Sequence, residues 1–392
     1  MPAKRILILT FYYPPDLCAG SFRAGALMKA LQQKAADNLK FEVLTTMPNR
    51  YHSFKSEAPG FEQIGDVTVR RFDIKSHKSG FLDQSLSFAS YARQVLSHTR
   101  GEEYDQVFAT SSRLMTAALG ASIARKKRLP LYLDIRDIFT DTMSDILSKP
   151  LKMSILPVFR LLERYALSSA TVMNLVSQGF EGYFHSYGDK SPLRFFTNGI
   201  DSEFLEYDFR APSTIGDRKV ILFAGNIGEG QGLDKLIPQA ADLLIGSYDF
   251  VIIGDGGAKS KLVKECAGAD NVKFIAPVNR EELKVHYANA DILLMHLNDY
   301  EAFKKVLPSK IFEYAATGKP ILAGVSGFAA EFTEKHVENA AVFQPCDADA
   351  MVNGLASLDL CMRDRKDFKE QFSRTNIMED MASDVLSLLP VS

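Results

Sequence analysis

Strand-like and helix-like runs alternate along the whole chain, and this alternation limits its possible folds more than any other feature. Short apolar runs are separated by longer stretches with helical spacing of apolar residues, a pattern that predicts parallel sheets joined by crossover helices. In the first half, strands are expected at residues 5–10, 41–46, 67–72, 106–110, 131–134, 171–175 and 193–196, and helices at 19–33, 85–99, 116–127, 154–166 and 177–186. In the second half, strands are expected at 219–223, 248–253, 272–275, 292–297, 320–324 and 341–343, and helices at 233–245, 257–267, 280–288, 310–316, 329–335 and 368–389.

A polar stretch at residues 201–218 separates the two series. It contains Pro212 and Gly216 and lacks strong periodicity, which is typical of a linker. The chain has 392 residues, enough for two domains with full cores. We therefore predict an α/β protein with two doubly wound domains, residues 1–205 and 206–374, that face each other across a cleft. Such sheets bind ligands at the carboxyl ends of their strands, so motifs directly after strands are the candidate sites.

Composition argues against several classes of protein. No window approaches the about 20 apolar residues that a membrane-spanning helix needs. The first apolar run is too short for a signal peptide and ends in prolines, so a cytoplasmic location is expected. The four cysteines, Cys18, Cys266, Cys346 and Cys361, form no CxxC pair, which argues against a zinc site or a disulfide framework.

The charge is unevenly distributed although its sum, −2, is small. Residues 1–205 carry 26 Lys and Arg against 20 Asp and Glu, whereas the rest of the chain carries 20 against 28. This positive excess is too weak to indicate a nucleic-acid partner. It suits an anionic membrane surface or an anionic acceptor, and ordinary variation of surface charge explains it equally well.

The first candidate site follows the first strand. The double proline at residues 14–15 must end that strand because proline cannot donate a ladder hydrogen bond. The backbone N–H groups of Gly20, Ser21 and Phe22 then open a helix, and such unpaired groups attract anions. Arg23 could reach the same anion or a neighbouring carboxylate. The alternative is that the glycine serves only the packing of the strand–helix junction.

The second candidate site follows the first strand of the second series, where the chain reads FAGNIGEGQG from Phe223. Its glycines, Gly225 and Gly228 among them, fit either a flexible connection or a close approach to a diphosphate. A further turn, IIGDGG at residues 252–257, places Gly254 at the end of a buried strand. Simple turn chemistry and contact with a nucleoside explain that glycine equally well.

The most informative stretch reads LPSKIFEYAATGKPIL from Leu307. Ser309 is expected to cap a short helix, and Lys310 lies in its first turn, where a cation is unfavourable unless an anion is bound. Glu313 lies one turn further along the same face. The pair either forms an intrahelical ion pair worth about 0.3 kcal/mol or binds two parts of one ligand. In the second case Lys310 holds a phosphate and Glu313 accepts hydrogen bonds from ribose hydroxyls.

Taken together, these motifs resemble those of the family-4 retaining glycosyltransferases with the GT-B fold. The likeness rests on YYPPDLCAGSFR, VSQGFEGYF, FFTNGID, FAGNIGEGQGL, IIGDGG and PSKIFEYAATGKPIL. The nearest sub-group is that of bacterial N-acetylfucosaminyl and other amino-sugar transferases of O-antigen or capsule synthesis. The resemblance implies two Rossmann-like domains and a last helix, about residues 375–392, that returns to the first domain.

The resemblance assigns roles residue by residue. Gly20 would lie against the donor diphosphate, Asn198 would face the cleft, and Glu313 matches the second glutamate of the family's Glu-x7-Glu motif. The first glutamate is replaced by Lys305, which leaves the donor sugar open. The family's Arg and Lys of the glycine-rich loop are also absent, and Asn226 and Gln231 stand near their places. Lys310 is the candidate for that missing charge.

The implied reaction is transfer from a nucleoside-diphosphate sugar, by default UDP-linked, with retention and without a metal or other cofactor. The acceptor would be a saccharide or a polyprenyl-linked saccharide. The family's first-domain histidine is absent, and LDIRD at residues 133–137 lies in its neighbourhood, after a strand. Asp137 either acts on the acceptor hydroxyl as base or orienting group, or only pairs with Arg136 or Arg23. Lys310 would stabilise the leaving diphosphate, and we predict no metal site.

A basic amphipathic stretch at residues 147–166 has two interpretations. It is either a helix that touches the cytoplasmic face of the inner membrane, suited to a lipid-linked acceptor, or a core helix with a solvated basic face. Two alternatives to the transferase also stay open: a degenerate protein that binds a nucleotide sugar without turnover, and a sugar-nucleotide 2-epimerase.

Overall fold

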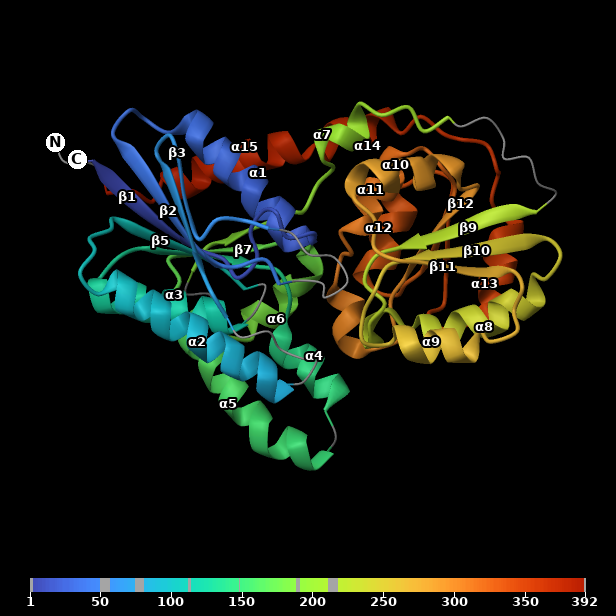
Figure 1. The fold of residues 1–392 in the computed structure, drawn as a ribbon, viewed down its shortest axis with the longest axis horizontal. Helices are drawn as coiled ribbons and strands as arrows, with labels where there is room; N and C mark the ends of the chain where they lie inside the picture. The colour runs from blue at the N-terminus through green and yellow to red at the C-terminus, as the bar shows by residue number, and fades with distance from the viewer. Residues whose placement is uncertain are drawn as a thin grey trace. The chain divides into compact units, whose positions relative to one another are not determined.

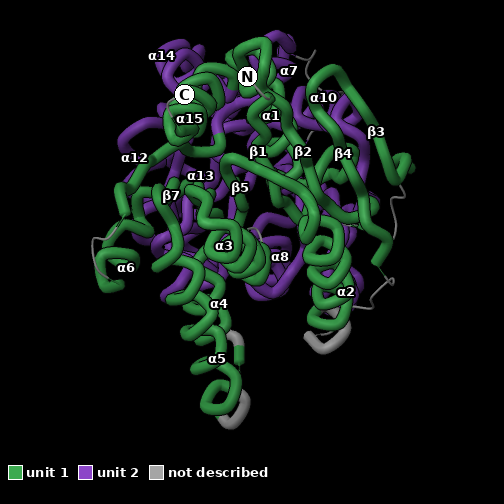
Figure 2. The backbone as a smooth tube through the Cα atoms, turned by 90° about the vertical axis from the view of Figure 1, so that its left-hand side faces the viewer, with its two compact units in different colours: residues 1–198, 375–392 green, residues 199–374 purple. Residues whose placement is uncertain are grey.

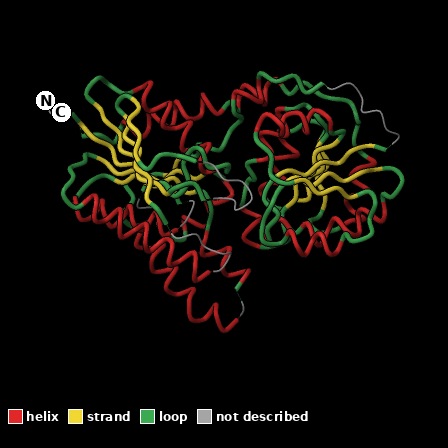
Figure 3. Tube along the Cα trace, in the orientation of Figure 1, coloured by secondary structure: helices red, strands yellow, loops and turns green. Residues whose placement is uncertain are grey.

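The computed structural model describes residues 3–49, 57–74, 81–111, 114–147, 149–187, 191–210 and 218–390. The chain divides into two compact units (Figure 2), one made of residues 1–198 and 375–392 and the other of residues 199–374. Each unit is a sheet with helices on both faces (Figure 3). The predicted α/β fold of two Rossmann-like domains is therefore confirmed.

The first unit has an eight-stranded sheet with the order β3-β4-β2-β1-β5-β6-β7-β8. All neighbouring strands run parallel except β3, which pairs antiparallel with β4. The strands are β1 (Lys4–Leu9), β2 (Leu39–Thr46), β3 (Phe61–Ile64), β4 (Val67–Phe72), β5 (Gln106–Thr110), β6 (Leu131–Ile135), β7 (Val172–Leu175) and β8 (Leu193–Arg194). The chain order reverses between β1 and β5, so a crevice for ligands is expected beyond their carboxyl ends.

The helices of this unit cover both faces of the sheet (Figure 1). They are α1 (Ala19–Lys34), α2 (Phe81–Thr99), α3 (Leu114–Lys127), α4 (Phe139–Ile146), α5 (Lys149–Leu167), α6 (Glu181–His185) and α15 (Arg374–Leu386). Helices α1 and α15 lie on one face, and α2 and α3 lie on the other. Met378, Met381 and Val385 of α15 are fully buried, and they pack into the same core as Leu31 of α1 and Phe41 of β2.

The second unit has a six-stranded, wholly parallel sheet with the order β11-β10-β9-β12-β13-β14. The strands are β9 (Lys219–Ala224), β10 (Tyr248–Ile253), β11 (Val272–Ile275), β12 (Ile292–His296), β13 (Ile321–Gly324) and β14 (Ala340–Phe343). Strands β9 and β12 are almost completely buried at their carboxyl ends, as expected for strands covered on both faces. The reversal of chain order here falls between β9 and β12.

Two separate apolar cores cover the faces of this second sheet. One is built with α8 (Leu233–Leu243), α9 (Lys259–Glu265) and α13 (Ala348–Ala356). The other is built with α7 (Ser202–Leu205), α10 (Arg280–Asn289), α11 (Lys310–Ala316), α12 (Phe328–His336) and α14 (Lys366–Gln371). Short 3-10 turns occur at Gln178–Phe180, Glu229–Gln231 and Glu301–Lys305.

Each predicted strand overlaps an observed one, but several short elements were missed. Strand β3 is an edge strand with mostly exposed side chains, so it shows no apolar face in the sequence. Helices α4, α7 and α13 were also missed, since they have only 8, 4 and 9 residues and a helical pattern cannot repeat over so short a length. The predicted helix at residues 368–389 is interrupted at Ser373, which pairs with Ile200.

The boundary between the units falls at residues 198/199 rather than at the expected 205/206. Ile200 N–H donates to Phe372 O at 2.7 Å, and Arg374 N–H donates to Ile200 O at 2.8 Å. Phe204 and Phe209 are buried in the second unit's core. The first part of the expected linker therefore belongs to the second unit, and residues 211–217 lie outside the described residues.

Candidate functional site

The loops at the carboxyl ends of β9, β10 and β12 bring most of the second-unit candidates together. They comprise residues 225–232, 254–258 and 297–309, and the last of them leads into α11. Because β9 and β12 are neighbours at the point where the chain order reverses, this edge is where a doubly wound sheet binds its ligand.

Gly225 and Gly254 form the tightest part of this edge. A Cβ on Gly225 would lie 2.1 Å from Lys310 Nζ, and a Cβ on Gly254 would lie 1.8 Å from Gly225 O. Both glycines also have positive φ, of 145° and 147°. A side chain at Gly254 would therefore collide with backbone, and a side chain at Gly225 would displace the Lys310 ammonium, which lies against bare backbone there. It also lies 5.0 Å from the ring centroid of Phe223.

Asn226 and Gln231 fold the glycine-rich loop onto itself. Asn226 Nδ2 donates to Gln231 Oε1 at 2.9 Å, and Gly228 N–H donates to the same oxygen at 3.1 Å. The two polar side chains that replace the family's basic residues thus order the loop internally. The loop's positive charge comes from Lys310, which lies next to it through the fold.

Glu313 lies one turn beyond Lys310 on α11, in a largely buried position. Burial raises its pKa, while the charges of Arg280, Arg374 and Lys310 oppose that rise. Tyr287 donates its hydroxyl to Glu313 Oε2 at 3.4 Å. A carboxylate in this setting is a strong acceptor for hydroxyl groups.

Ser309 and Lys305 precede Lys310 on the same segment of the chain. Ser309 stands at the N-cap position of α11 as expected, but its side chain makes no capping hydrogen bond, because its backbone is already helical. Lys305 ends the short 3-10 turn before the same loop. The structure thus places both residues on the segment between β12 and α11.

In the first unit, Gly20 and Ser21 lie in the first turn of α1, as predicted. Cys18 is the N-cap residue, and Phe22 N–H donates to Cys18 O at 3.1 Å. Ser21 is fully buried, and its Oγ has no hydrogen-bond partner within the described part of the chain. The Phe22 N–H group is therefore used by the helix itself.

Arg23 takes the second of its two predicted alternatives, the neighbouring carboxylate. It is 1% exposed, and its Nε and Nη2 donate to the two oxygens of Asp134 at 2.8 and 2.9 Å. Its other donors go to the carbonyls of Phe196 and Thr197. Burial opposes a charge on Asp134, but Arg23 outweighs it and lowers the pKa of Asp134. The expected contact between Arg23 and a donor anion is thus not what this arrangement provides.

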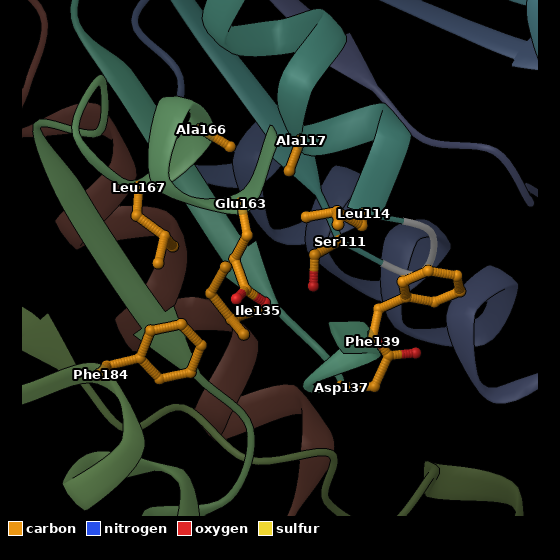
Figure 4. A pocket seen from close by; sticks show the side chains of 10 residues that line it. All are labelled: Ser111, Leu114, Ala117, Ile135, Asp137, Phe139, Glu163, Ala166, Leu167 and Phe184. Atoms are coloured by element: carbon orange, nitrogen blue, oxygen red, sulfur yellow. The ribbon is translucent and has the colours of Figure 1, made fainter. Parts of the chain in front are cut away.

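Asp137 lines a small pocket at the ends of β5 and β6 (Figure 4), together with Ser111, Phe139 and Glu163. The enclosed space measures about 10 Å³, room for about one water molecule. Burial raises the pKa of Asp137 to about 7, and the negative charge of Glu163 adds to the rise while Arg136 opposes it. A carboxyl group with such a pKa can accept or release a proton near neutral pH.

Glu163 was missed by the sequence analysis. It is 3% exposed on α5 and accepts hydrogen bonds from the hydroxyls of Tyr183 and Tyr187, both at 2.6 Å. Burial raises its pKa as well. The available signal was a single carboxylate within the apolar spacing of the 147–166 stretch, which nothing in the sequence connects to Asp137.

Asn198 is the last residue of the first unit before the crossing to the second. It is 4% exposed, and its Oδ1 lacks a hydrogen-bond partner among the residues that the structure describes. Over the same residues, no group of three or more His, Cys, Asp or Glu side chains is placed to hold a metal ion. Nor does any described helix have the length and apolar character needed to cross a membrane.

Comparison with known proteins supports a single family. Residues 206–374 match the family model of glycosyl transferases group 1. The GDP-mannose-dependent alpha-(1-6)-phosphatidylinositol monomannoside mannosyltransferase of Mycobacterium tuberculosis H37Rv is 28% identical over 226 residues, 54% of this chain and 58% of that protein. The putative colanic acid biosynthesis glycosyl transferase WcaI of Escherichia coli K12 is 27% identical over 177 residues, 43% of each chain. The matches thus span about half the length of these relatives.

Solved structures extend the comparison to the whole fold. The lipopolysaccharide outer core galactosyltransferase WaaB has a TM-score of 0.62 at 12% identity, covering 98% of this chain and 99% of its own. Trehalose-6-phosphate synthase OtsA has a TM-score of 0.70 at 12% identity, covering 99% and 100%. Anabaena HepE in complex with UDP has a TM-score of 0.57 at 16% identity, covering 98% and 97%. The fold is therefore the GT-B fold that these solved structures share, and residues 206–374, most of the second unit, match the model of glycosyl transferases group 1.

Proposed function

We propose that this protein transfers a sugar from a nucleoside-diphosphate sugar to a saccharide or lipid-linked saccharide during synthesis of a glycolipid or cell-surface polysaccharide. The observation that carries the proposal is the placement of Lys310 Nζ against Gly225 at the reversal point of the second sheet. Glu313 lies one turn away on the same helix. The family model covers this same unit, and the relatives are named as glycosyltransferases.

In the proposed reaction, negative charge develops on the diphosphate as the sugar leaves it. The bond between the anomeric carbon and the diphosphate oxygen breaks, a glycosidic bond forms to the acceptor oxygen, and the acceptor proton passes to the leaving phosphate or a nearby base. Lys310 and the backbone N–H groups around Gly225 would stabilise the negative charge that grows on the diphosphate. Glu313 would accept hydrogen bonds from the ribose hydroxyls. This proposal includes retention at the anomeric carbon and needs no metal, since a lysine supplies the positive charge.

Asp137 would act in the first unit on the acceptor hydroxyl. Its pKa of about 7 suits the transfer of a proton at neutral pH. Gly20 and Ser21 would approach the diphosphate, and Asn198 would face it from the end of the first unit. Lys305, in place of the family's glutamate, would contact the donor sugar.

The nucleotide base of the donor has two candidates. The resemblance to amino-sugar transferases favours a UDP-linked donor, whereas the mycobacterial relatives are named GDP-mannose-dependent. The amino-sugar sub-group itself is part of the proposal. A panel of UDP, GDP, ADP, dTDP and CMP therefore comes first.

The test is a thermal-shift panel on wild type, Lys310→Ala and Glu313→Gln, with Lys335→Ala, an exposed lysine of α12, as the matched control. A nucleotide at about 100 times its dissociation constant stabilises the protein by about 2.7 kcal/mol. One diphosphate should raise the melting temperature of wild type and the control, and this shift should be lost in both site variants. If no nucleotide shifts wild type, or if both site variants respond fully, the proposal fails.

A second candidate is a protein that binds the nucleotide sugar without turnover. The replacement of the expected glutamate by Lys305 and of the basic loop residues by Asn226 and Gln231 favours it. Donor-dependent release of nucleoside diphosphate in the presence of acceptor separates it from the transferase. A 2-epimerase would instead change the donor sugar without any acceptor.

We also propose that α5 contacts the cytoplasmic face of the inner membrane. Met153, Val158 and Leu161 are 81%, 55% and 68% exposed on this helix. Arg160 and Arg164 are exposed between and beyond them. Exposed apolar side chains flanked by cations suit an anionic bilayer surface, where a lipid-linked acceptor is found.

A further inference from the structure

We propose that His296 and Asn298 are positioning residues that hold the glycine-rich loop in the shape that binds the donor diphosphate. This inference rests on the proposed function and names two residues outside the recognised motifs. His296 is the last residue of β12, and Asn298 follows two residues later. Both residues bond to backbone carbonyls of residues 229–231, so each acts on the loop through its backbone.

Three consecutive carbonyl oxygens of the loop each accept a hydrogen bond from this short segment. Asn298 Nδ2 donates to Glu229 O at 2.8 Å, and Asn298 N–H donates to Gly230 O at 2.9 Å. His296 Nδ1 lies 2.5 Å from Gln231 O. The next residue, Gly232, has φ +59°, and a Cβ there would lie 3.1–3.2 Å from Asn298. The segment therefore holds the carbonyl of every residue from 229 to 231, and the turn ends at a residue whose backbone favours glycine.

The surroundings of His296 determine which ring nitrogen carries the proton. Cys346 N–H donates to His296 Nε2 at 2.9 Å, so Nε2 must be unprotonated and Nδ1 must carry the hydrogen that goes to Gln231 O. The imidazole is 2% exposed and stacks on Phe343, with ring centroids 6.1 Å apart. A Cβ on Gly324 would lie 2.2 Å from the ring, so the ring has one orientation.

The side chain of Gln231 passes this constraint to the part of the loop nearest Lys310. Its Oε1 accepts from Asn226 Nδ2 and from Gly228 N–H. A hydrogen-bonded chain thus runs from Cys346 after β14, through His296 and Gln231, to Gly228. The loop that would cradle the diphosphate is tied to the strand on the other side of the reversal point.

The test compares substitutions that keep or remove single hydrogen bonds. The side-chain amide nitrogen of asparagine takes about the place of His296 Nδ1, so His296→Asn keeps the hydrogen bond to Gln231 O. The side-chain amide of glutamine reaches about the place of Nε2, so His296→Gln keeps only the hydrogen bond from Cys346 N–H. Asn298→Asp keeps the acceptor oxygen and replaces the donor to Glu229 O. Lys235→Ala is the control, because it removes a contact to Asn298 Oδ1 at 2.9 Å and leaves the three carbonyl bonds intact.

Two readouts are measured: the dissociation constant of the best nucleoside diphosphate, and amide hydrogen exchange of a peptide covering residues 225–232 without ligand. His296→Gln and Asn298→Asp should weaken nucleotide binding about tenfold and speed exchange in that peptide. His296→Asn and Lys235→Ala should stay within about threefold of wild type in affinity. Wild-type affinity in His296→Gln and Asn298→Asp would overturn the proposal, and so would an equal loss in His296→Asn.

The two proposals fail in distinguishable ways. If wild type binds none of the nucleotides, the proposed function is wrong, and the exchange measurement alone decides the inference on loop shape. Faster exchange in His296→Gln and Asn298→Asp, with His296→Asn like wild type, then supports the role in positioning. Unchanged exchange in the first two variants overturns it.

Discussion

At the scale of single residues, the two candidate sites are built from pairs of different kinds. Lys310 and Glu313 lie one turn apart on α11, whereas only the fold brings Asp137 and Glu163 to one pocket. Lys310 and Glu313 were found because they share one short helix, and Gly225 because a strand leads directly into it. Glu163 could not be found this way, since it meets Asp137 only where α5 and the segment after β6 line the same pocket. The sequence allowed two partners for Arg23, a bound anion or a neighbouring carboxylate, because it does not show which acceptor the fold places next to a guanidinium.

The pH dependence of stability provides a prediction at this scale. Burial lowers the pKa of His296 to about 4, below the about 6.5 of an unfolded chain. As pH falls below about 6.5, the unfolded state binds the proton first, so stability is lost progressively until pH falls to about 4. The loss should amount to about 3 kcal/mol. Urea unfolding of wild type and His296→Asn at several pH values measures it.

The variant removes the titrating group and keeps the hydrogen bond to Gln231 O, so its stability should fall less steeply over this interval. All other groups titrate alike in the two proteins. Parallel curves for wild type and variant would show that His296 is not held neutral by the fold.

At the scale of elements, buried strands were predictable because their apolar runs are nearly continuous. Strand β3 was not, since its pairing depends on the turn at Gly65, with φ +58°, rather than on an apolar pattern. Helix α5 was predicted, but its pattern did not show which side faces solvent. The structure buries Leu156, Phe159 and Glu163 and leaves Met153 and Leu161 exposed.

Binding to lipid vesicles tests the proposed role of α5. Replacing Met153, Val158 and Leu161 by serine should weaken binding to anionic vesicles by at least about tenfold, because each apolar side chain contributes when it is buried. Adding Arg160→Gln and Arg164→Gln to these changes should weaken vesicle binding further at low salt. The affinity of the wild-type protein for anionic vesicles should fall as the salt concentration rises. Co-sedimentation with vesicles of defined anionic content gives the affinities.

Leu86→Ser provides the control for α5, because Leu86 is 70% exposed on a different helix of the same unit. This variant should bind vesicles like wild type. An equal loss in Leu86→Ser, or no loss in the triple variant, would contradict a specific membrane contact through α5.

At the scale of the whole molecule, the two series of strands made two similar sheets predictable. They did not show to which unit the last helix, α15, belongs. Composition and periodicity do not show which unit α15 joins, and the resemblance alone suggested its return to the first. Its apolar residues fill the first unit's core, and Tyr132 and Arg194 both bond to Asp384 at 2.9 Å.

Matched methionine substitutions test this arrangement. Met381 of α15 and Met351 of α13 are both fully buried, in the cores of the first and second unit respectively. Each change to alanine should cost about 2–5 kcal/mol. Native-state hydrogen exchange should show lost protection in the first unit for Met381→Ala and in the second for Met351→Ala. Protection lost from the second unit in Met381→Ala would contradict the assignment of α15.

The return of α15 also affects how the chain matures during translation. The ribosome releases residues 1–198 first, but the helix that covers one face of their sheet emerges only after residues 199–374 of the second unit. The second unit, which is continuous in sequence, can complete its core before the first does. Until α15 emerges, the nascent first unit exposes the apolar face around Leu31 and Phe41, a surface for chaperones. A stop codon shortly after residue 374 would therefore remove the last part of the first unit.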